Sequence, residues 1–226
     1  MPRTAEFDPT QALRAAMLAF WANGYEATSL QDLLSATGLS KSSLYATFGG
    51  KRQLFLAAFA HYQEERLFHT RRILAEAEDG RGAIASFFRQ VIVRSAPAAD
   101  PEQTAGGAAH ADGCMNANEA VELAPRDADV RAMVAGFNAQ VAALLAGAIR
   151  RGQADGSIRS AADAETLAGA LLVYLQGIWV MARAQAGAPS LLASLEATLT
   201  LLDGTTEPLP PAQPAGSNKQ ATNQTQ

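Results

Sequence analysis

Side chains suited to binding another molecule are concentrated in one short stretch, residues 28–51, which reads TSLQDLLSATGLSKSSLYATFGGK. Lysine, serine, threonine and tyrosine can donate hydrogen bonds to phosphate oxygens, and several of them can also reach base edges. These residue types alternate with leucines at helical spacing, so a helix would gather them on one face. The candidate contact residues are Thr28, Lys41, Ser42, Ser43, Tyr45, Thr47 and Lys51.

Two short helices are predicted to carry these side chains. Thr28 and Ser29 are both competent N-caps for a helix that ends near Thr37. After a glycine turn, Ser40 can cap a second helix that ends at Phe48. The apolar residues that would hold the two helices together are Leu33, Leu34, Leu39, Leu44 and Phe48. Such a helix-turn-helix can place its second helix in the major groove of DNA, although glycine-linked helix pairs also occur in ordinary all-α cores.

Three short motifs make this pattern more specific. A glycine–hydrophobic–serine turn, an aromatic-x-x-Phe helix end and a lysine that opens the next helix stand at Gly38–Ser40, Tyr45–Phe48 and Lys51. The earlier positions that fit the same pattern are Phe20, Gly24, Thr28 and Leu30. Residues 10–58 therefore resemble the DNA-binding domain of the TetR family of transcriptional regulators. Residues 59–203 resemble that family only in architecture and length.

The resemblance implies a role for each candidate contact residue. Thr28 would donate to a phosphate from the start of its helix, and Lys51 would reach a phosphate with the help of a helix N-terminus. The residues expected at base edges are Lys41, Ser42 and Ser43, and those expected at the DNA backbone are Tyr45 and Thr47. Many relatives carry a second aromatic residue and a histidine where Ala46 and Thr47 stand here, which leaves base reading at that end of the helix open.

The net charge of −4 does not by itself favour a nucleic-acid partner. Residues 1–60 carry five basic and four acidic side chains, whereas the remainder carries 13 basic and 18 acidic ones. The basic side chains expected to neutralise phosphates are Lys41, Lys51 and Arg52, with Arg3 and Arg14 as further candidates. The prediction of DNA binding therefore rests on motif geometry rather than on bulk charge.

The single cysteine, Cys114, is the second candidate site. It lies in the segment HADGCMN, at the predicted start of a helix capped by Asp112. A helix N-terminus can lower a thiol pKa and permit reaction with electrophiles or oxidants, and some family members resemble this segment, with a Gly-Cys pair beside the ligand pocket. The alternative is an unreactive pocket or core cysteine, which the charge of Asp112 favours. His110 and Cys114 lack the further ligands that a metal site needs, so neither a metal nor another cofactor is predicted.

Helical periodicity continues along the chain and predicts an all-α fold. The first helix begins with Asp8 as N-cap and Pro9 at the first helical position, with Gln11 placed to complete a capping box. Later helices are expected at about 51–78, 82–94, 113–124, 127–152, 162–186 and 189–203. We expect a three-helix helix-turn-helix domain over 1–55, a larger helical domain for sensing and dimerisation over 56–204, and a disordered tail over 205–226.

The last two helices are predicted to form a homodimer interface, since the resemblance implies a dimer. Their apolar faces comprise Leu167, Leu171, Leu172, Leu175, Ile178, Trp179 and Ala182, followed by Leu191, Leu192, Leu195, Leu199 and Leu202. Two such helices from each subunit could form an isologous four-helix interface, with Ala168 and Gly169 allowing close approach. An ordinary monomer core is the alternative.

The size of the C-terminal part favours a ligand-sensing role, with an unidentified small molecule as inducer. The side chains that could line an apolar cavity are Phe59, Tyr62, Cys114, Met115, Tyr174 and Trp179, although most of them could equally be core residues. The alternatives are electrophile or oxidant sensing through Cys114, an architectural DNA-binding protein and a helical-bundle enzyme. An enzyme is disfavoured because the sequence carries no recognisable cluster of catalytic acids, histidines or metal ligands.

Other features predict a cytoplasmic protein that does not enter a membrane. The first residues lack an apolar signal-peptide core, and uninterrupted apolar stretches such as Leu171–Leu175 are far shorter than the roughly 20 residues that span a bilayer. A single cysteine fits a reducing compartment. Together with the resemblance to the TetR family, these features predict a cytoplasmic homodimeric repressor, not an enzyme, that leaves its operator DNA when a small molecule binds.

Overall fold

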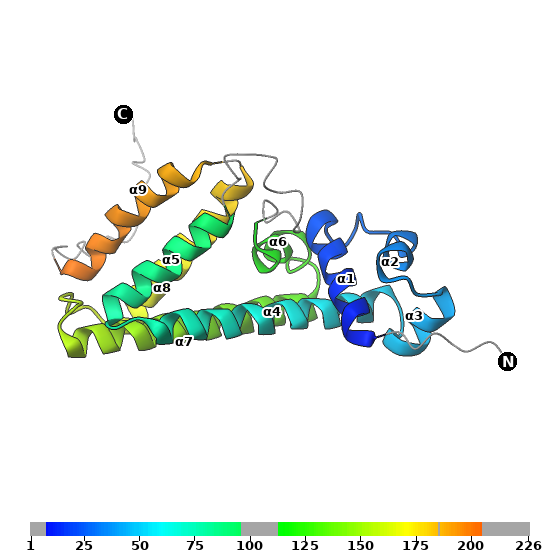
Figure 1. Ribbon diagram of the computed structural model, residues 1–226, viewed down its shortest axis with the longest axis horizontal. Helices are drawn as coiled ribbons and strands as arrows, with labels where there is room; N and C mark the ends of the chain where they lie inside the picture. Colours follow the sequence, from blue (N-terminus) through cyan, green and yellow to red (C-terminus); the bar gives the residue numbers. More distant parts are fainter. Residues whose placement is uncertain (1–7, 96–112, 185, 205–226) are drawn as a thin grey trace, which may run out of the picture.

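The computed structural model describes residues 8–95, 113–184 and 186–204 of the 226-residue chain. Over these residues every regular element is a helix, which confirms the predicted fold class. The helices are α1 Pro9–Asn23, α2 Leu30–Thr37, α3 Lys41–Phe48, α4 Lys51–Glu76, α5 Gly80–Ser95, α6 Met115–Glu122, α7 Ala128–Asp155, α8 Ala164–Arg183 and α9 Ala188–Leu199, followed by the 3-10 turn η3 Thr200–Asp203. Helices α1–α3 form a small head at one end, α5–α9 form the body, and α4 runs from the head along the body beside α7 (Figure 1).

Most helix ends follow from local side-chain chemistry. Asp8 caps α1 by accepting a hydrogen bond from the Thr10 N–H at 2.8 Å, and Pro9 is the first helical residue, as predicted. The expected capping box with Gln11 does not form there. A capping box forms instead at α2, where Ser29 and Asp32 each accept a hydrogen bond from the other's backbone N–H.

The first hydrophobic core joins the head to the body. Phe20, Leu33, Leu44 and Phe55 are fully buried, and the Phe20 and Phe55 rings meet edge to face at 5.2 Å. The same cluster continues into side chains of α4, α6 and α7, among them Phe59, Tyr62, Met115, Leu123, Val130 and Val134. The expected domain boundary at residues 55 and 56 therefore falls within one helix and one packed cluster.

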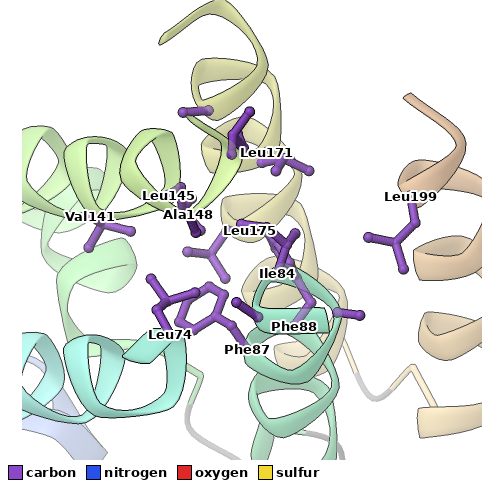
Figure 2. Close-up of a cluster of buried hydrophobic side chains, with 14 of the residues drawn as sticks. Leu74, Ile84, Phe87, Phe88, Val141, Leu145, Ala148, Leu171, Leu175 and Leu199 are labelled. Atoms are coloured by element: carbon purple, nitrogen blue, oxygen red, sulfur yellow. The ribbon is translucent and has the colours of Figure 1, made fainter. Parts of the chain in front are cut away.

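The second core fills the body (Figure 2). Leu74, Ile84, Phe88, Leu145 and Leu175 meet there from α4, α5, α7 and α8. The side chains that the sequence analysis assigned to a dimer interface belong to this core: Leu167, Leu171, Leu175, Ile178, Ala182, Leu191, Leu195, Leu199 and Leu202 are buried, while Leu172, Trp179 and Leu192 pack against it partly buried. For the nine buried side chains that assignment was wrong, because they pack within the subunit.

A different face of α8 is directed outward. Val173, Val180 and Met181 are 73%, 61% and 51% exposed. Burying side chains of this size against a partner releases about 25 cal/mol per Å² of apolar surface. If the chain forms a dimer, this outward face is the part of α8 that remains available to a second subunit.

Helices α7 and α8 are long and apolar enough to cross a membrane by length and composition alone. The prediction that every apolar stretch is too short to span a membrane therefore holds only for uninterrupted runs of apolar residues, not for whole helices. The two helices pack against each other and against α5 in the body core. Core helices of water-soluble proteins pass the same length and composition test, so the property carries little weight.

Candidate DNA-binding surface and sensor cavity

The predicted helix-turn-helix is present, and its geometry follows from a few local features. Helix α2 ends at Gly38, which has φ +68° in the left-handed region that glycine tolerates best. Ser40 then caps α3 by accepting a hydrogen bond from the Ser43 N–H at 3.1 Å. Leu33 and Leu44 are fully buried between the helices. The inner faces therefore fix α3, the candidate recognition helix, and leave its other side directed outward.

The exposed side of α3 carries most of the predicted DNA contacts. Lys41, Ser42, Tyr45 and Thr47 are exposed, and Tyr45 keeps 49% of its surface accessible. Ser43 is half-buried, and its hydroxyl lies 2.8 Å from that of Ser40. These side chains form a small polar surface without acidic residues, which suits approach to phosphates and base edges.

Thr28 does not have the position that its expected role requires. Its side chain is fully buried, and its hydroxyl donates to the Gly24 carbonyl at 2.6 Å. Ser29 rather than Thr28 is the N-cap of α2, so Thr28 lies one residue too early to face outward. We therefore correct its role from a phosphate contact to a link between the ends of α1 and α2.

The two basic residues that open α4 have different environments. The Lys51 ammonium lies 4.4 Å from the centre of the Tyr25 ring, at the first turn of α4. Arg52 donates instead to Asp127 at 2.7 Å and to Asp129 at 2.7 Å, at the start of α7. Arg52 is therefore engaged with the body, and the expectation that it neutralises a phosphate is not supported by this geometry.

A cavity lies in the body between α4, α5, α7 and α8, with Trp21 of the head at its edge. The space inside it that a water-sized sphere can reach is about 80 Å³, room for a few water molecules and below the roughly 300–1,000 Å³ of drug-sized ligand sites. Of the six predicted sensor residues, Tyr62, Cys114 and Trp179 line it. Its polar lining residues, which include Arg66, His69, Thr70, Gln90 and Arg94, were not predicted from the sequence.

The other three predicted sensor residues are packing residues. Phe59 and Met115 are fully buried in the core that joins head and body. Tyr174 packs against Phe88, and its hydroxyl lies 2.8 Å from the Ser194 hydroxyl, so it joins α8 to α9. Aromatic type and helical spacing alone do not distinguish a cavity wall from a core.

Cys114 lines the cavity, and its thiol is buried. It is itself the N-cap of α6, while the expected cap Asp112 lies outside the described residues. The residue is only 2% exposed, and the Tyr62 hydroxyl donates to its Sγ at 3.2 Å. Burial raises the pKa of the Cys114 thiol and outweighs the opposing effects of the Tyr62 hydrogen bond and the Arg66 charge. These observations favour the unreactive pocket cysteine over the sensing thiol.

N-ethylmaleimide is accordingly expected to modify Cys114 slowly, at a rate that follows unfolding, since only the thiolate reacts. The measurement is labelling by mass spectrometry in buffer and in increasing urea, with fully unfolded protein as the reference for a free thiol. Cys114→Ser should bind DNA as the unmodified protein does. Rapid labelling in buffer, accompanied by loss of DNA binding that Cys114→Ser escapes, would establish the sensing thiol instead.

Helix α6 contains a buried carboxyl group that no sequence motif marks. Glu119 is 1% exposed, and its Oε2 has no hydrogen-bond partner among the described residues. Burial, followed by the nearby Glu122 carboxylate, raises the pKa of Glu119 from 4.5 to about 8. Glu122 in turn accepts a hydrogen bond from the Glu26 N–H of the head at 2.9 Å. Near neutral pH, Glu119 therefore remains protonated beside the contact between head and body.

Glu119→Gln is expected to remove a pH dependence of stability. The unfolded chain loses the Glu119 proton above its ordinary pKa of 4.5, whereas the folded chain keeps it until about pH 8. Wild-type stability therefore falls as pH rises through this window, by up to about 1.4 kcal/mol per pH unit from this group. The glutamine variant should lack this loss in urea melts between pH 5 and pH 8, and the exposed Glu64→Gln should keep it. Equal slopes for wild type and Glu119→Gln would contradict the assignment.

A chain of amide side chains connects four helices near this point. The Gln63 amide donates to Asn116 at 2.9 Å, and Asn116 donates to Asn138 at 3.1 Å. Gln176 also donates to Asn138, at 3.3 Å. The network joins α4, α6, α7 and α8, and a satisfied buried network of this kind favours one arrangement of the helices over others.

Comparison with known sequences covers both the head and the body. Residues 12–58 match the family described as "Bacterial regulatory proteins, tetR family", and residues 103–193 match "Tetracyclin repressor-like, C-terminal domain". The chain is 31% identical over 200 residues to the HTH-type transcriptional repressor ComR of Escherichia coli (strain K12), covering 88% of this chain and 90% of ComR. It is 36% identical over 131 residues to the uncharacterized HTH-type transcriptional regulator YezE of Bacillus subtilis (strain 168). That match spans 58% of this chain and 62% of YezE, so it covers just under two thirds of the length of YezE.

Solved structures show the same relationship. A cysteine-substituted TetR family transcriptional regulator CifR, complexed with 26-base-pair double-strand operator DNA, is 31% identical and superposes with a TM-score of 0.75, covering 89% of this chain and 100% of CifR. A TetR transcriptional regulator from Chloroflexus aurantiacus is 25% identical, with a TM-score of 0.72 over 84% of this chain and 91% of that one. With the helix-turn-helix geometry, these matches show that the chain belongs to the TetR family of DNA-binding transcriptional regulators.

Proposed function

We propose that this regulator is a homodimeric repressor that leaves its operator when a small molecule occupies the cavity in the body. The observation that carries the proposal is the path of α4. This helix begins with Lys51, separated from the recognition helix by two residues, and its middle part contributes Tyr62, Arg66 and Thr70 to the cavity wall. A continuous helix of 26 residues is about 39 Å long, so a ligand that displaces α4 at the cavity also displaces the head.

Two polar links would help the head to move with the body. Arg52, at the start of α4, pairs with Asp127 and Asp129 at the start of α7. On the other side, the Glu26 N–H donates to Glu122 at the end of α6. Side chains of α6 and α7 share one hydrophobic cluster with the head. If a ligand shifts these two helices, the head would therefore be tilted with them and would not rotate freely.

The outward face of α8 supports the proposed dimer. Val173, Val180 and Met181 are exposed there, and the glycine at position 177 has no heavy atom close to where a side chain would begin. A two-fold interface places the same patch of both subunits in contact, and a glycine in the patch allows two helices to approach closely. The two recognition helices would then enter successive major grooves, about 34–36 Å apart. We place this regulator in the cytoplasm, where operator DNA is available to it.

Operator affinity is expected to fall with salt, with a slope of log affinity against log salt of about −4 to −5. Lys41 and Lys51, together with the exposed Arg14, give two or three cations per head. Each neutralised phosphate contributes about −0.9 to the slope. Lys51→Ala should weaken binding to all operator variants alike and bring the slope nearer to zero by about 2 for a dimer.

Fluorescence anisotropy with labelled DNA from the region upstream of the gene, measured between 50 and 300 mM salt, provides this slope. Arg150→Gln, at the far end of the body, is the matched control and should keep the wild-type slope. A wild-type slope near zero, or a Lys51→Ala slope equal to that of wild type, would argue against the proposed DNA contacts.

A further inference from the structure

The cavity in the body has a marked excess of positive charge. Arg66 and His69 reach it from α4, and Arg94 reaches it from the end of α5. Among the described residues that line it, none is acidic. The described lining of the cavity therefore contains two guanidinium groups and no carboxylate to balance their charge.

Two donor-capable nitrogens at this site also lack partners. Arg66 Nε and His69 Nδ1 are buried, and neither has a hydrogen-bond partner among the described residues. A buried polar group without a partner destabilises the fold, so such groups are rare unless a ligand or water completes them. Arg66 is one turn from Tyr62, with its guanidinium carbon 5.5 Å from the centre of that ring, which keeps the charge beside the cavity.

The pKa of His69 indicates the sign of the electrostatic potential at the cavity wall. Burial, followed by the charges of Arg66, Arg94 and Arg72, lowers the pKa of His69. Glu65, one turn earlier on α4 and 3.5 Å from the His61 imidazole, has the opposite effect, which is smaller than those of burial and the three arginines. The cavity wall near His69 is therefore a region that disfavours an additional positive charge and favours a negative one.

Apart from Thr70, Gln90 and Ser95, most of the remaining lining is apolar. Ile73, Phe87, Phe137, Val141, Leu175 and Trp179 supply most of the remaining wall. A ligand that fits both the cationic part and the apolar part of the cavity must combine one compact anionic group with an apolar body. A planar carboxylate matches the fork of a guanidinium in two parallel hydrogen bonds. A dianionic phosphate would leave more oxygens to satisfy against this mainly apolar wall.

We propose that the cavity binds a small organic carboxylate, with its carboxylate at Arg66, His69 and Arg94 and its aromatic or alkyl body against the apolar wall. This inference rests on the proposed function, because it names the chemical class of the molecule that occupies the sensor cavity. It also explains why cationic side chains line a cavity in which the fold itself supplies no carboxylate partner for them.

The chain provides a site-specific signal for the test. It contains two tryptophans, Trp21 and Trp179, and both line the cavity. Benzoate, phenylacetate and hexanoate are titrated into the full-length protein, each beside its neutral primary amide of nearly equal size. At least one carboxylate should change the tryptophan fluorescence saturably, and its amide should bind at least about tenfold more weakly, since a charge-assisted hydrogen bond is lost.

Arg66→Gln and Arg94→Gln are each expected to weaken binding of that carboxylate about 10- to 100-fold. Arg71→Gln removes an exposed charge from the same helix outside the cavity and should change binding less than twofold. Circular dichroism melts establish that each variant is folded. Should Arg66→Gln fail to fold, Arg94→Gln at the end of α5 supplies the same comparison. Equal binding of acid and amide, an unchanged affinity in folded variants, stronger competition by phenyl phosphate, or no binding by any of the three carboxylates would overturn the assignment.

Operator binding, measured on the same samples, separates this inference from the function on which it rests. A carboxylate that binds at the cavity and releases the DNA supports both. A carboxylate that binds with the expected dependence on Arg66 but leaves the DNA complex intact supports the ligand class and contradicts ligand-induced release. Release of the DNA by the neutral amides alone would support induction and contradict the ligand class.

Discussion

Leu44→Ala is expected to lower the free energy of unfolding by about 2–5 kcal/mol, as other large-to-small core substitutions do. Leu44 is fully buried on the inner face of α3, in the cluster that contains Leu33 and Phe55. Removing its side chain leaves a void that neighbouring helices can fill only by moving. Because α3 has only eight residues and depends on this contact for its position, operator binding should also be lost at temperatures where the head is unfolded.

Ser43→Ala is the matched comparison, one position earlier on the same helix. Its hydroxyl is near the outer surface, so stability should change by about 0.5 kcal/mol or less. Preference among operator variants should change more than stability does. Urea melts and binding to a panel of operator variants provide the two measurements. If Ser43→Ala unfolds the head and Leu44→Ala does not, the assigned faces of α3 are rotated.

Gly80→Ala is expected to destabilise the body by about 3 kcal/mol or more, toward the upper end of overpacking effects. Gly80 is the first residue of α5 and lies directly against the backbone of α7. A Cβ atom there would overlap the backbone of Gly152 and come within 2.5 Å of the Ala148 carbonyl oxygen. Backbone atoms of two packed helices cannot rotate away as a flexible side chain can, so α5 must shift. Such a shift would also displace the α5 wall of the cavity.

Gly136→Ala is the control for this substitution. Gly136 lies on the exposed side of α7, and no heavy atom lies within 4 Å of the added Cβ position. Alanine in a helix interior is favoured over glycine by about 0.5–1 kcal/mol, so this variant should be slightly more stable than the wild type. Thermal and urea melts of both variants test the pair. A Gly80→Ala protein as stable as Gly136→Ala would show that α5 and α7 are not in backbone contact.

Local features of the fold could be predicted well from the sequence. Asp8 and Ser40 cap the helices that they were expected to cap, and glycine at position 38 ends α2 as expected. These signals act over three or four residues, so they do not depend on the rest of the chain. Thr28 shows the limit of such reasoning, because two adjacent residues were competent caps and only the tertiary position of Ser29 decides between them.

Long-range relationships could not be predicted in the same way. The leucines of α8 and α9 indicate that one face is buried, but a periodic pattern does not say whether a core or a partner subunit covers it. Arg52 pairs with acidic residues 75 and 77 positions away. The sequence does not reveal these partners, so Arg52 was predicted to neutralise a DNA phosphate. Arg66 and Arg94 converge on the cavity from two helices, and no local motif marks them. The polar part of the proposed sensor site therefore becomes visible only in three dimensions.

Selection of duplexes from a random DNA pool by the purified full-length protein, followed by sequencing, tests the central claim most directly. A dimer that inserts one α3 helix into each of two successive major grooves should enrich a two-fold symmetric sequence with half-sites about one helical turn apart, roughly 34–36 Å. The folded variant Ser43→Ala should enrich a sequence altered within those half-sites. Enrichment of no common sequence, or of a single half-site without symmetry, would contradict a dimeric repressor that reads its operator through α3.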